Sequence, residues 1–442
     1  MPLSNEIGLQ IPSILLPKST INLQKWAVIA CDQFTSEPEY WQKVEDIVGE
    51  EPSTYQMILP EVFLETAQEN QRIQNTYEAM HRFIKSEIFK QFDGFIYVLR
   101  KLDNGQVRRG LMVCLDLEHY DYHQGAQTLI RATEGTILDR LPPRIRIREQ
   151  AALELPHILV LFDDPNDTVF SEIDERLMQY DKLYDFDLML GSGHLSGYAL
   201  DDEAMQMHIL QSLKNLINPE MFAEKYNLIP GKHQPLLFAM GDGNHSLATA
   251  KALWEKIKPE VGMDHPARYA LVEIENVHDP ALTFEPIHRL LFDLNKAITN
   301  EMRTFWGEKF NLTTFDDFAA MQKIVDEASE PWHQVGMIDA DGIKLLEIKN
   351  PSDNLPVGTL QKFLDVFMEG GGAEKIDYVH GTEVLTEKGA VQGNVGFYVP
   401  GIDKSDLFKT VILDGALPRK TFSMGEAKDK RFYMECRQIQ SE

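Results

Sequence analysis

The stretch FAMGDGNHSLATAKALWEK, residues 238–256, joins a predicted strand to a predicted helix. Residues 236–240 form an apolar run with the length of a buried strand. Beyond a polar cluster, apolar residues recur at spacings of three and four, the period of a helix: Leu247, Ala250, Trp254 and Ile257. The polar cluster is therefore expected where a strand ends and a helix begins.

The turn between these two elements carries the groups that a phosphate site needs. The N-terminal end of a helix attracts anions through its free N–H groups and its dipole. We expect Gly243 to permit the turn and Asn244 or Ser246 to cap the helix. His245 is a candidate to hydrogen-bond or protonate a phosphate oxygen, and Asp242 is a candidate ligand of magnesium.

Two other interpretations of this turn stay open. A Gly-Asp-Gly turn before a capped helix is also an ordinary structural device, and the pattern is neither a Walker loop nor a Rossmann fingerprint. A nucleophilic pair of His245 and Ser246 would indicate a hydrolase. We disfavour that pair because neighbouring residues of a helix do not face each other.

The length and composition indicate a globular protein with two domains. The chain has 442 residues, of which 43% are hydrophobic and 25% charged. Predicted strands and helices are mixed without strict alternation, which favours the α+β class. We place an N-terminal α+β domain at residues 1–225 and a second domain, with the polar turn, at residues 226–442.

The net charge and the hydrophobic pattern of the chain indicate which partners and which cellular compartment to expect. A formal charge of −26 disfavours binding to nucleic acid, because phosphates are repelled. The sequence contains no stretch of 18 apolar residues, so we expect no membrane span. The first residues lack the pattern of a signal peptide. We therefore expect a cytoplasmic protein. The three cysteines are far apart, which argues against a disulfide framework.

Several charged residues elsewhere are candidates for the same site. Asp32 follows a predicted strand at residues 21–31 and suits a general base, although it also suits a turn. Arg131 begins an arginine-rich stretch in an otherwise acidic chain. His288 and Arg289 are a candidate second phosphate clamp before a predicted helix, with a plain charged pair as the alternative.

Residues 242–246, Asp-Gly-Asn-His-Ser, resemble the D-G-H-H-R hallmark of the DUF1015 family, which follows an apolar strand. Further landmarks of that family occur in order along the chain: Asp32, residues 131–136 with Glu134, residues 286–289 and residues 418–421. The resemblance spans nearly the whole chain. Asn244 and Ser246 depart from the hallmark, and loss of its arginine removes a bidentate phosphate clamp.

DUF1015 proteins are similar to the free serine kinases of the ParB/sulfiredoxin-like superfamily. The resemblance implies a nucleotide-binding α+β region of that type, with an additional C-terminal α+β portion. It also implies that the D-G-x-H turn grips phosphates and that an acid from elsewhere assists the substrate hydroxyl.

The leading hypothesis is therefore phosphoryl transfer from ATP or ADP, with magnesium, to a small hydroxyl-containing metabolite. The predicted catalytic residues are Asp32, Glu134 and His245. The predicted nucleotide-binding residues are Asp242, Gly243, Asn244, His245, Ser246, Arg131, His288 and Arg289, with Asp242 also on the metal. The alternative is a non-catalytic, nucleotide-binding regulatory module.

Overall fold

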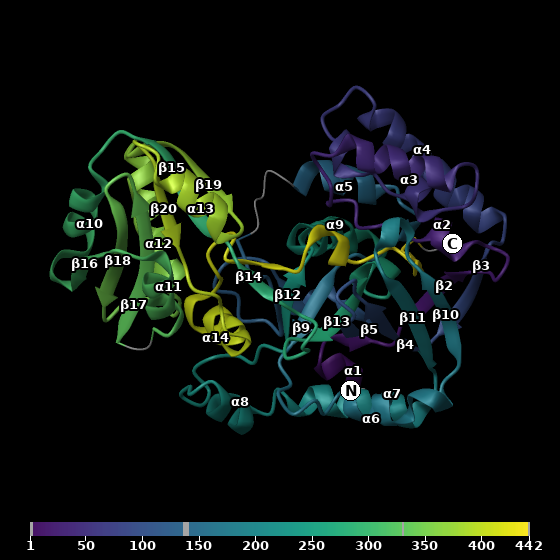
Figure 1. Ribbon diagram of the computed structural model, residues 1–442. Coiled ribbons are helices and arrows are strands. Elements are labelled where there is room, and N and C mark those ends of the chain that lie inside the picture. Colours follow the sequence, from purple (N-terminus) through teal and green to yellow (C-terminus); the bar gives the residue numbers. More distant parts are fainter. Residues whose placement is uncertain (1–2, 136–140, 329–330, 441–442) are drawn as a thin grey trace. The chain divides into compact units, whose positions relative to one another are not determined.

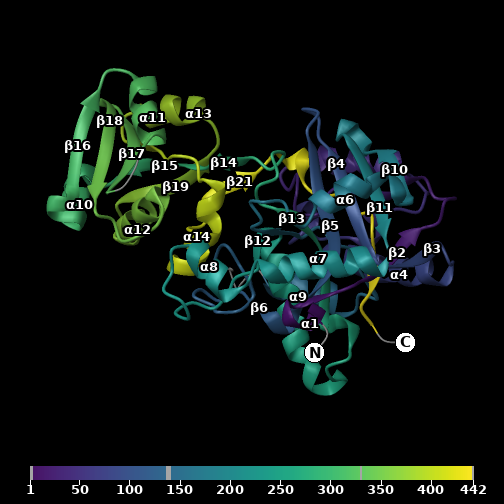
Figure 2. The same cartoon turned by 90° about the horizontal axis from the view of Figure 1, so that it is seen from below.

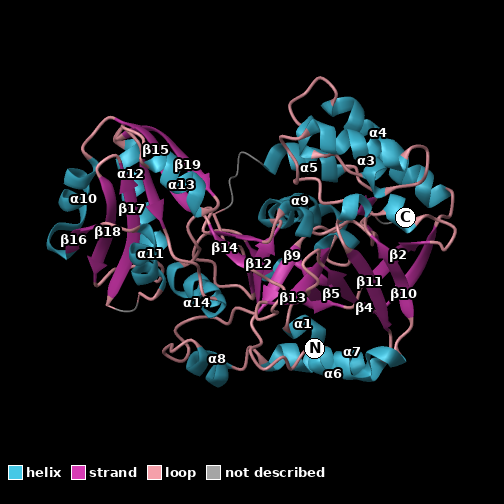
Figure 3. Cartoon of the chain, in the orientation of Figure 1, coloured by secondary structure: helices cyan, strands magenta, loops and turns pink. Residues whose placement is uncertain are grey.

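The computed structural model describes residues 3–135, 141–328 and 331–440 (Figure 1). The chain divides into two compact units: Met1–Leu282 with Gly425–Glu442, and Thr283–Met424. This division differs from the predicted boundary between residues 225 and 226. Residues 226–282 belong to the first unit because two of its central strands lie there, β12 (Phe238–Asp242) and β13 (Tyr269–Asn276). The predicted α+β class is confirmed (Figure 3).

A ten-stranded sheet forms the centre of the first unit. Its order is β10-β11-β4-β5-β13-β9-β12-β7-β6, and β1 pairs with β5. The remaining strands are β1 (Leu9–Gln10), β4 (Phe95–Lys101), β5 (Val107–Asp116), β6 (Tyr120–Asp121), β7 (Ile130–Arg131), β9 (Leu159–Phe162), β10 (Lys182–Asp187) and β11 (His194–Leu200). Most neighbours are antiparallel, but β13 and β9, β12 and β7, and β7 and β6 are parallel. The mixed pairing explains why no regular alternation was visible in the sequence.

Both faces of this sheet are buried. Side chains alternate between two core clusters, so that Ile96 packs in one and Tyr97 in the other. The first cluster includes residues of α3 (Pro38–Val48) and α4 (Glu69–Lys85). The second includes residues of α7 (Glu203–Asn215) and α9 (Asn244–Val261) (Figure 2). Helices on both faces remove the apolar side chains of the sheet from water.

Shorter elements complete the first unit. They are α1 (Leu3–Glu6), α2 (Leu23–Trp26), α5 (Leu141–Glu149), α6 (Ser171–Arg176), α8 (Pro219–Lys225), β2 (Ser13–Pro17), β3 (Phe89–Asp93), β8 (Leu153–Glu154) and β22 (Arg437–Gln438). The strand predicted at residues 21–31 is wrong. Asn22 instead caps α2 by accepting from the N–H groups of Gln24 and Lys25, and an extended segment follows.

Residues 431–433 of the C-terminal segment, which comprises residues 425–440, run antiparallel to that extended segment. The N–H of Ala30 donates to the carbonyl of Arg431 at 2.9 Å, and the N–H of Tyr433 donates to the carbonyl of Val28 at 2.8 Å. Ile29 and Phe432 form a β-bridge between them. The two ends of the first unit's chain are thus held side by side.

The second unit is built on an antiparallel six-stranded sheet. Its order is β16-β18-β17-β20-β15-β19. The strands are β15 (His288–Leu294), β16 (Phe310–Phe315), β17 (Trp332–Asp339), β18 (Gly342–Lys349), β19 (Ala373–Val379) and β20 (Val395–Tyr398), with the separate pair β14 (Phe284–Pro286) and β21 (Phe422–Met424). The helices are α10 (Ile298–Trp306), α11 (Phe318–Asp326), α12 (Pro356–Glu369), α13 (Thr382–Gly389) and α14 (Lys404–Asp414).

Candidate functional site

The turn between β12 and α9 is present as predicted, but its cap differs from the prediction. Gly243 is the residue that caps the helix, with φ 83°, and it has no side chain with which to accept a hydrogen bond. Asn244 is already the first helical residue, so neither it nor Ser246 occupies the capping position. A Cβ atom at Gly243 would lie 3.2 Å from the Cα of Ile158. Both the left-handed backbone and the close neighbour therefore favour glycine here.

Asp242 ends β12 with both carboxylate oxygens in use. The N–H of Gly243 donates to Oδ1 at 2.9 Å, and the Nζ of Lys430 lies 3.0 Å from Oδ2. The side chains of Asp242 and Lys430 are 26% and 13% exposed. Burial acts to raise the pKa of Asp242, but Lys430, His157 and the Gly243 amide outweigh it, and the pKa is lowered. A charged pair therefore stands at the N-terminal end of α9.

Ser246 contacts His157 rather than its neighbour His245. Its Oγ lies 2.9 Å from the Nε2 of His157, and the Nδ1 of the same ring lies 2.9 Å from the hydroxyl of Tyr433. The Tyr433 hydroxyl also accepts the backbone N–H of Cys31 at 3.1 Å. A continuous hydrogen-bonded chain thus joins the N-terminal region, the C-terminal segment and the start of α9.

Strand pairing and a buried arginine place His157 beside the turn. His157 precedes β9, and β9 runs antiparallel to β12 with Leu159 opposite Asp242. The guanidinium of Arg431, 4% exposed, donates to the carbonyl of Pro156 at 3.1 Å. Because Arg431 precedes Phe432 in the bridge to Ile29, the C-terminal segment orients the backbone just before His157.

The loop that carries Asp32 reaches the same hydrogen-bonded chain. Its neighbour Cys31 donates to Tyr433, and one Asp32 oxygen accepts from the side-chain amide of Gln33 at 3.0 Å. Burial first, and then the neighbouring side chains of Cys31 and Asp32, hold the pKa of Tyr433 well above its usual range. Burial also raises the pKa of the Cys31 thiol, which argues against a reactive thiolate.

Thr133, the residue before the predicted catalytic residue Glu134, contacts the strand and helix that flank the turn. The hydroxyl of Thr133 donates to the carbonyl of Met240 at 2.8 Å, and the side-chain amide of Asn244 lies 3.5 Å from the same hydroxyl. The parallel pairing of β7 with β12 brings this stretch alongside the turn. Thr136, part of the same motif, lies outside the described residues.

Arg131 lies on β7, but its guanidinium is engaged elsewhere. It donates to the carbonyls of Thr128 and Gln234 at 2.8 Å and to that of Pro235 at 3.3 Å. Gln234 and Pro235 precede β12, whereas Asp242 ends it. Burial lowers the pKa of Arg131 to about 10. The guanidinium therefore holds the backbone at the opposite end of β12 from the turn.

His288 and Arg289 belong to the second unit, and both are buried. They lie on strand β15, so the helix predicted there is wrong. The Arg289 guanidinium donates to the carbonyls of Lys420 at 3.1 Å and Arg419 at 3.0 Å, and to the side chain of Gln361 at 3.0 Å. Burial first, and then Arg289 and a neighbouring histidine, lower the pKa of His288 to about 4.

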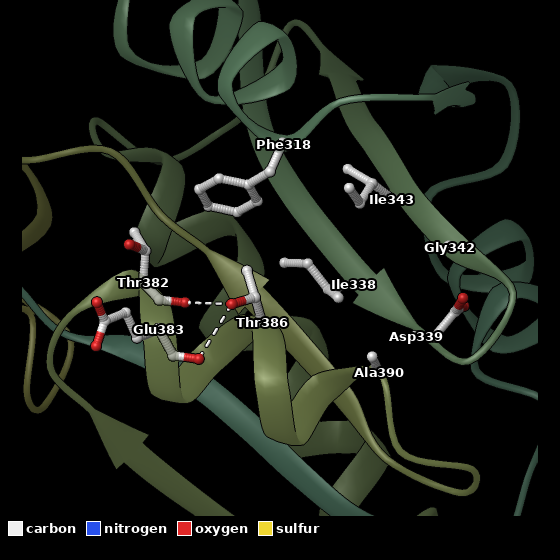
Figure 4. Close-up of a pocket in the computed structure, with 9 residues that line it drawn as sticks. All are labelled: Phe318, Ile338, Asp339, Gly342, Ile343, Thr382, Glu383, Thr386 and Ala390. Atoms are coloured by element: carbon white, nitrogen blue, oxygen red, sulfur yellow. Dashed lines mark hydrogen bonds between the residues drawn. The ribbon is translucent and has the colours of Figure 1, made fainter.

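The second unit also contains a cavity of about 390 Å³ between the β17–β18 hairpin, α11 and α13 (Figure 4). Phe318, Ile338 and Ile343 form much of its wall. The hydroxyl of Thr386 donates to the carbonyls of Thr382 and Glu383, at 2.8 and 3.0 Å, within α13. The lining is therefore mainly apolar, with a hydroxyl already bonded to its own helix.

Residues 3–135, 141–328 and 331–440 contain no group of three or more His, Cys, Asp or Glu side chains arranged to hold a metal. Within the same ranges, no helix has the length and apolar character needed to cross a bilayer.

The sequence pattern of a family described as "Protein of unknown function (DUF1015)" matches residues 15–367. The chain belongs to the DUF1015 family. The predicted membership is thereby confirmed, and the match ends before the residues that supply Lys430 and Tyr433 to the site.

Solved structures similar to this DUF1015 chain have low sequence identity to it. They include a conserved hypothetical protein from Pyrococcus furiosus, 10% identical with a TM-score of 0.36, covering 74% of this chain and 95% of that chain. A free serine kinase mutant in complex with AMP is 8% identical with a TM-score of 0.39, covering 76% and 92%. The same kinase with ADP is 9% identical with a TM-score of 0.39, covering 76% and 93%. At these values the similarity assigns no activity to this chain. No curated protein matches it.

Three residues of this site were missed by the sequence analysis: His157, Lys430 and Tyr433. The sequence offered only weak signals for them. His157 directly precedes an apolar run at residues 158–162, and Tyr433 stands near the C-terminal end among apolar residues. Neither position shows which partner it meets, because the pairing of β9 with β12 and of the C-terminal segment with residues 28–30 is long-range.

Proposed function

We propose that this DUF1015 protein binds a nucleotide through its phosphates at the N-terminal end of α9. The observation that carries the proposal is the convergence of Asp242, Lys430 and Ser246 on the start of an 18-residue helix. A helix N-terminus favours anions, and an ammonium group binds phosphate as a point charge. The hydroxyl of Ser246 adds a neutral hydrogen-bonding group beside them.

We further propose that the bound nucleotide donates its terminal phosphoryl group to a small hydroxyl-containing metabolite. The acceptor oxygen would form the new bond to phosphorus, the bond to the nucleotide oxygen would break, and Asp32 would take the hydroxyl proton. Glu134 and His245 remain candidates to orient the acceptor or a phosphate oxygen. Such chemistry depends chiefly on positioning and charge stabilisation. The ParB/sulfiredoxin-like assignment of the first unit stays a prediction.

Magnesium enters this proposal only as a companion of the nucleotide. The described residues offer one carboxylate at the turn, and its oxygens already contact the Gly243 amide and Lys430. Magnesium usually keeps several waters and bridges substrate phosphates, so a single protein carboxylate is compatible with it. When bound, the ion would neutralise phosphate charge, and every step above is assigned to residues of the chain.

The alternative is a nucleotide-binding module without turnover. It is favoured by Asn244 and Ser246, which stand where the family hallmark has histidine and arginine. It is also favoured by the Asp242–Lys430 pair, because this carboxylate is neutralised before any metal arrives. Binding of a nucleotide without formation of a phosphorylated product would support this alternative.

The first test is thermal unfolding with ATP, ADP and AMP, each with and without magnesium. A ligand present at 100 times its Kd stabilises the folded state by about 2.7 kcal/mol, which gives a measurable rise in Tm. We expect ATP or ADP to raise the Tm. No rise with any nucleotide at millimolar concentration would overturn the proposed function.

The second test separates transfer from binding. Radiolabelled ATP and ADP are incubated with small hydroxyl compounds, and labelled product is measured for the wild type, Asp242→Asn and Asp103→Asn. Asp103 is a matched control, because it pairs with Lys428 of the same C-terminal segment at 2.8 Å. We expect product with the wild type and the control and none with Asp242→Asn. Equal product from all three would remove Asp242 from the mechanism.

A further inference from the structure

The chain of hydrogen bonds that ends at Ser246 has a direction. It runs from the N–H of Cys31 to Tyr433 at 3.1 Å, to His157 Nδ1 at 2.9 Å, and from His157 Nε2 to Ser246 Oγ at 2.9 Å. All three distances are within the range of good hydrogen bonds. Each hydroxyl and the neutral imidazole in this chain has only one proton to donate. The direction of one hydrogen bond therefore determines the direction of the next.

The first group in the chain can only donate. A backbone N–H has no lone pair to offer, so the Tyr433 oxygen accepts from Cys31. The phenol proton then has two acceptors nearby, the Nδ1 of His157 and the sulfur of Cys31. Sulfur is a weak acceptor compared with an imidazole nitrogen. The favoured arrangement has Tyr433 donating to Nδ1.

The proton of the imidazole follows from that choice. With Nδ1 accepting, the neutral ring of His157 carries its proton on Nε2, and Nε2–H donates to the Oγ of Ser246. Ser246 then uses its oxygen as the acceptor and directs its own proton away from His157. The opposite direction would make His157 a base that withdraws the Ser246 proton, as in nucleophilic serine sites.

We infer that Tyr433 and His157 are positioning residues that fix the Ser246 hydroxyl as a hydrogen-bond donor to a phosphate oxygen of the ligand. The inference rests on the proposed function for the identity of that ligand, but the proton positions do not depend on it. Ser246 stands where the family hallmark has an arginine. The start of α9 therefore offers one oriented hydroxyl in place of the guanidinium of an arginine, which could donate two hydrogen bonds to a phosphate.

The direction is tested by NMR of protein labelled with ¹⁵N-histidine, at a pH where the ring of His157 is neutral. The His157 signals are assigned by their absence from the spectrum of His157→Gln. We expect a protonated Nε2 and an unprotonated Nδ1 in the wild type, and loss of this preference in Tyr433→Phe. A protonated Nδ1 with a bare Nε2 in the wild type would overturn the inference, whether or not the protein binds a nucleotide.

The consequence for binding is tested with ADP and inorganic pyrophosphate on the wild type, Ser246→Ala, Tyr433→Phe and the double variant. Each single substitution should raise the Kd roughly five- to tenfold, the loss of about one hydrogen bond. The double variant should bind no more weakly than Ser246→Ala, because Tyr433 acts through Ser246. Losses that multiply in the double variant would contradict that route.

Tyr226→Phe is the matched control for removal of a buried phenol hydroxyl. Tyr226 lies in the same unit, and its hydroxyl donates to Asp163 at 2.6 Å, outside the chain that ends at Ser246. It should leave both Kd values unchanged. If the wild type binds neither ADP nor pyrophosphate, both the proposed function and the contact of Ser246 with a ligand are overturned. The NMR spectrum tests the proton positions independently of that result.

Discussion

The ammonium of Lys430 lies 3.0 Å from the Oδ2 of Asp242, so a residue near the end of the chain neutralises the carboxylate that precedes α9. The pair is largely shielded from water, with side chains 13% and 26% exposed. This contact links the C-terminal segment to the turn that the sequence singles out.

Replacing Lys430 with methionine is expected to weaken the binding of ADP and pyrophosphate about ten- to a hundredfold. A hydrogen bond from a charged donor contributes about 1.5–3 kcal/mol, and its loss raises the Kd by that factor. Isothermal titration calorimetry measures the Kd. Lys428→Met, which removes a lysine paired with Asp103 on the same segment, should bind as the wild type does.

If Lys430 only neutralises Asp242 and does not bind phosphate, the expected results differ. Lys430→Met should lower stability by about 1 kcal/mol, because Asp242 keeps its charge without its partner. The double variant Asp242→Asn with Lys430→Met removes both charges and should regain that stability. If the double variant also regains wild-type affinity for pyrophosphate, Lys430 acts only by neutralising Asp242 and is not a phosphate ligand.

Gly243→Ala should destabilise the protein by about 2 kcal/mol. The left-handed φ of 83° costs an L-residue about 1–2 kcal/mol, and the new Cβ would meet Ile158 at 3.2 Å. Gly125→Ala is the control, since its φ is 79° but no atom lies within 4 Å of its Cβ position. Denaturation by urea should show a smaller loss for Gly125→Ala. Equal losses would indicate that only the backbone angle matters.

Arg289→Met should destabilise the second unit by about 3 kcal/mol. The substitution removes a guanidinium that is fully buried, and it leaves the buried side chain of Gln361 and the part-buried carbonyls of Arg419 and Lys420 without their donor. Thermal unfolding measures the loss. Arg419→Met is the control because its side chain is 60% exposed, and it should change the Tm little. Loss of ADP affinity at unchanged stability would instead support the predicted phosphate clamp at Arg289.

Glu275 should make stability fall as the pH rises. Burial, opposed by Arg108 and reinforced by Glu273, raises its pKa from 4.5 to about 8. A carboxyl with a raised folded-state pKa holds its proton more tightly in the folded state. Its contribution is therefore full below the unfolded pKa and is lost as the pH rises through about 8.

Glu275→Gln removes this titration. Between about pH 5 and pH 8, the free energy of unfolding of the variant should rise relative to that of the wild type by roughly 4 kcal/mol. Glu260→Gln, an exposed residue in the last turn of α9, should show no such trend. A difference between Glu275→Gln and the wild type that is independent of pH would contradict the raised pKa.

The sequence was sufficient for the strand, turn and helix around Gly243. Helical spacing from Leu247 to Trp254 and the apolar run before the turn are local patterns. The helix forms as expected, and the strand forms at Phe238–Asp242, two residues later than the predicted range 236–240. Local patterns failed at Ile21 and at His288. At the first, Asn22 caps a short helix, and at the second, pairing with two neighbouring strands overrides an apolar run that suggested a helix.

The sequence by itself determined the class of the fold, the DUF1015 membership and the position of the polar turn, because these depend on composition, order and short-range spacing. Only the tertiary structure decided which groups surround that turn. Antiparallel pairing of β9 with β12 brings His157 there, and pairing of the C-terminal segment with residues 28–30 brings Lys430 and Tyr433. Strand register depends on burying side chains of segments far apart in the chain, and no local pattern of residues records it.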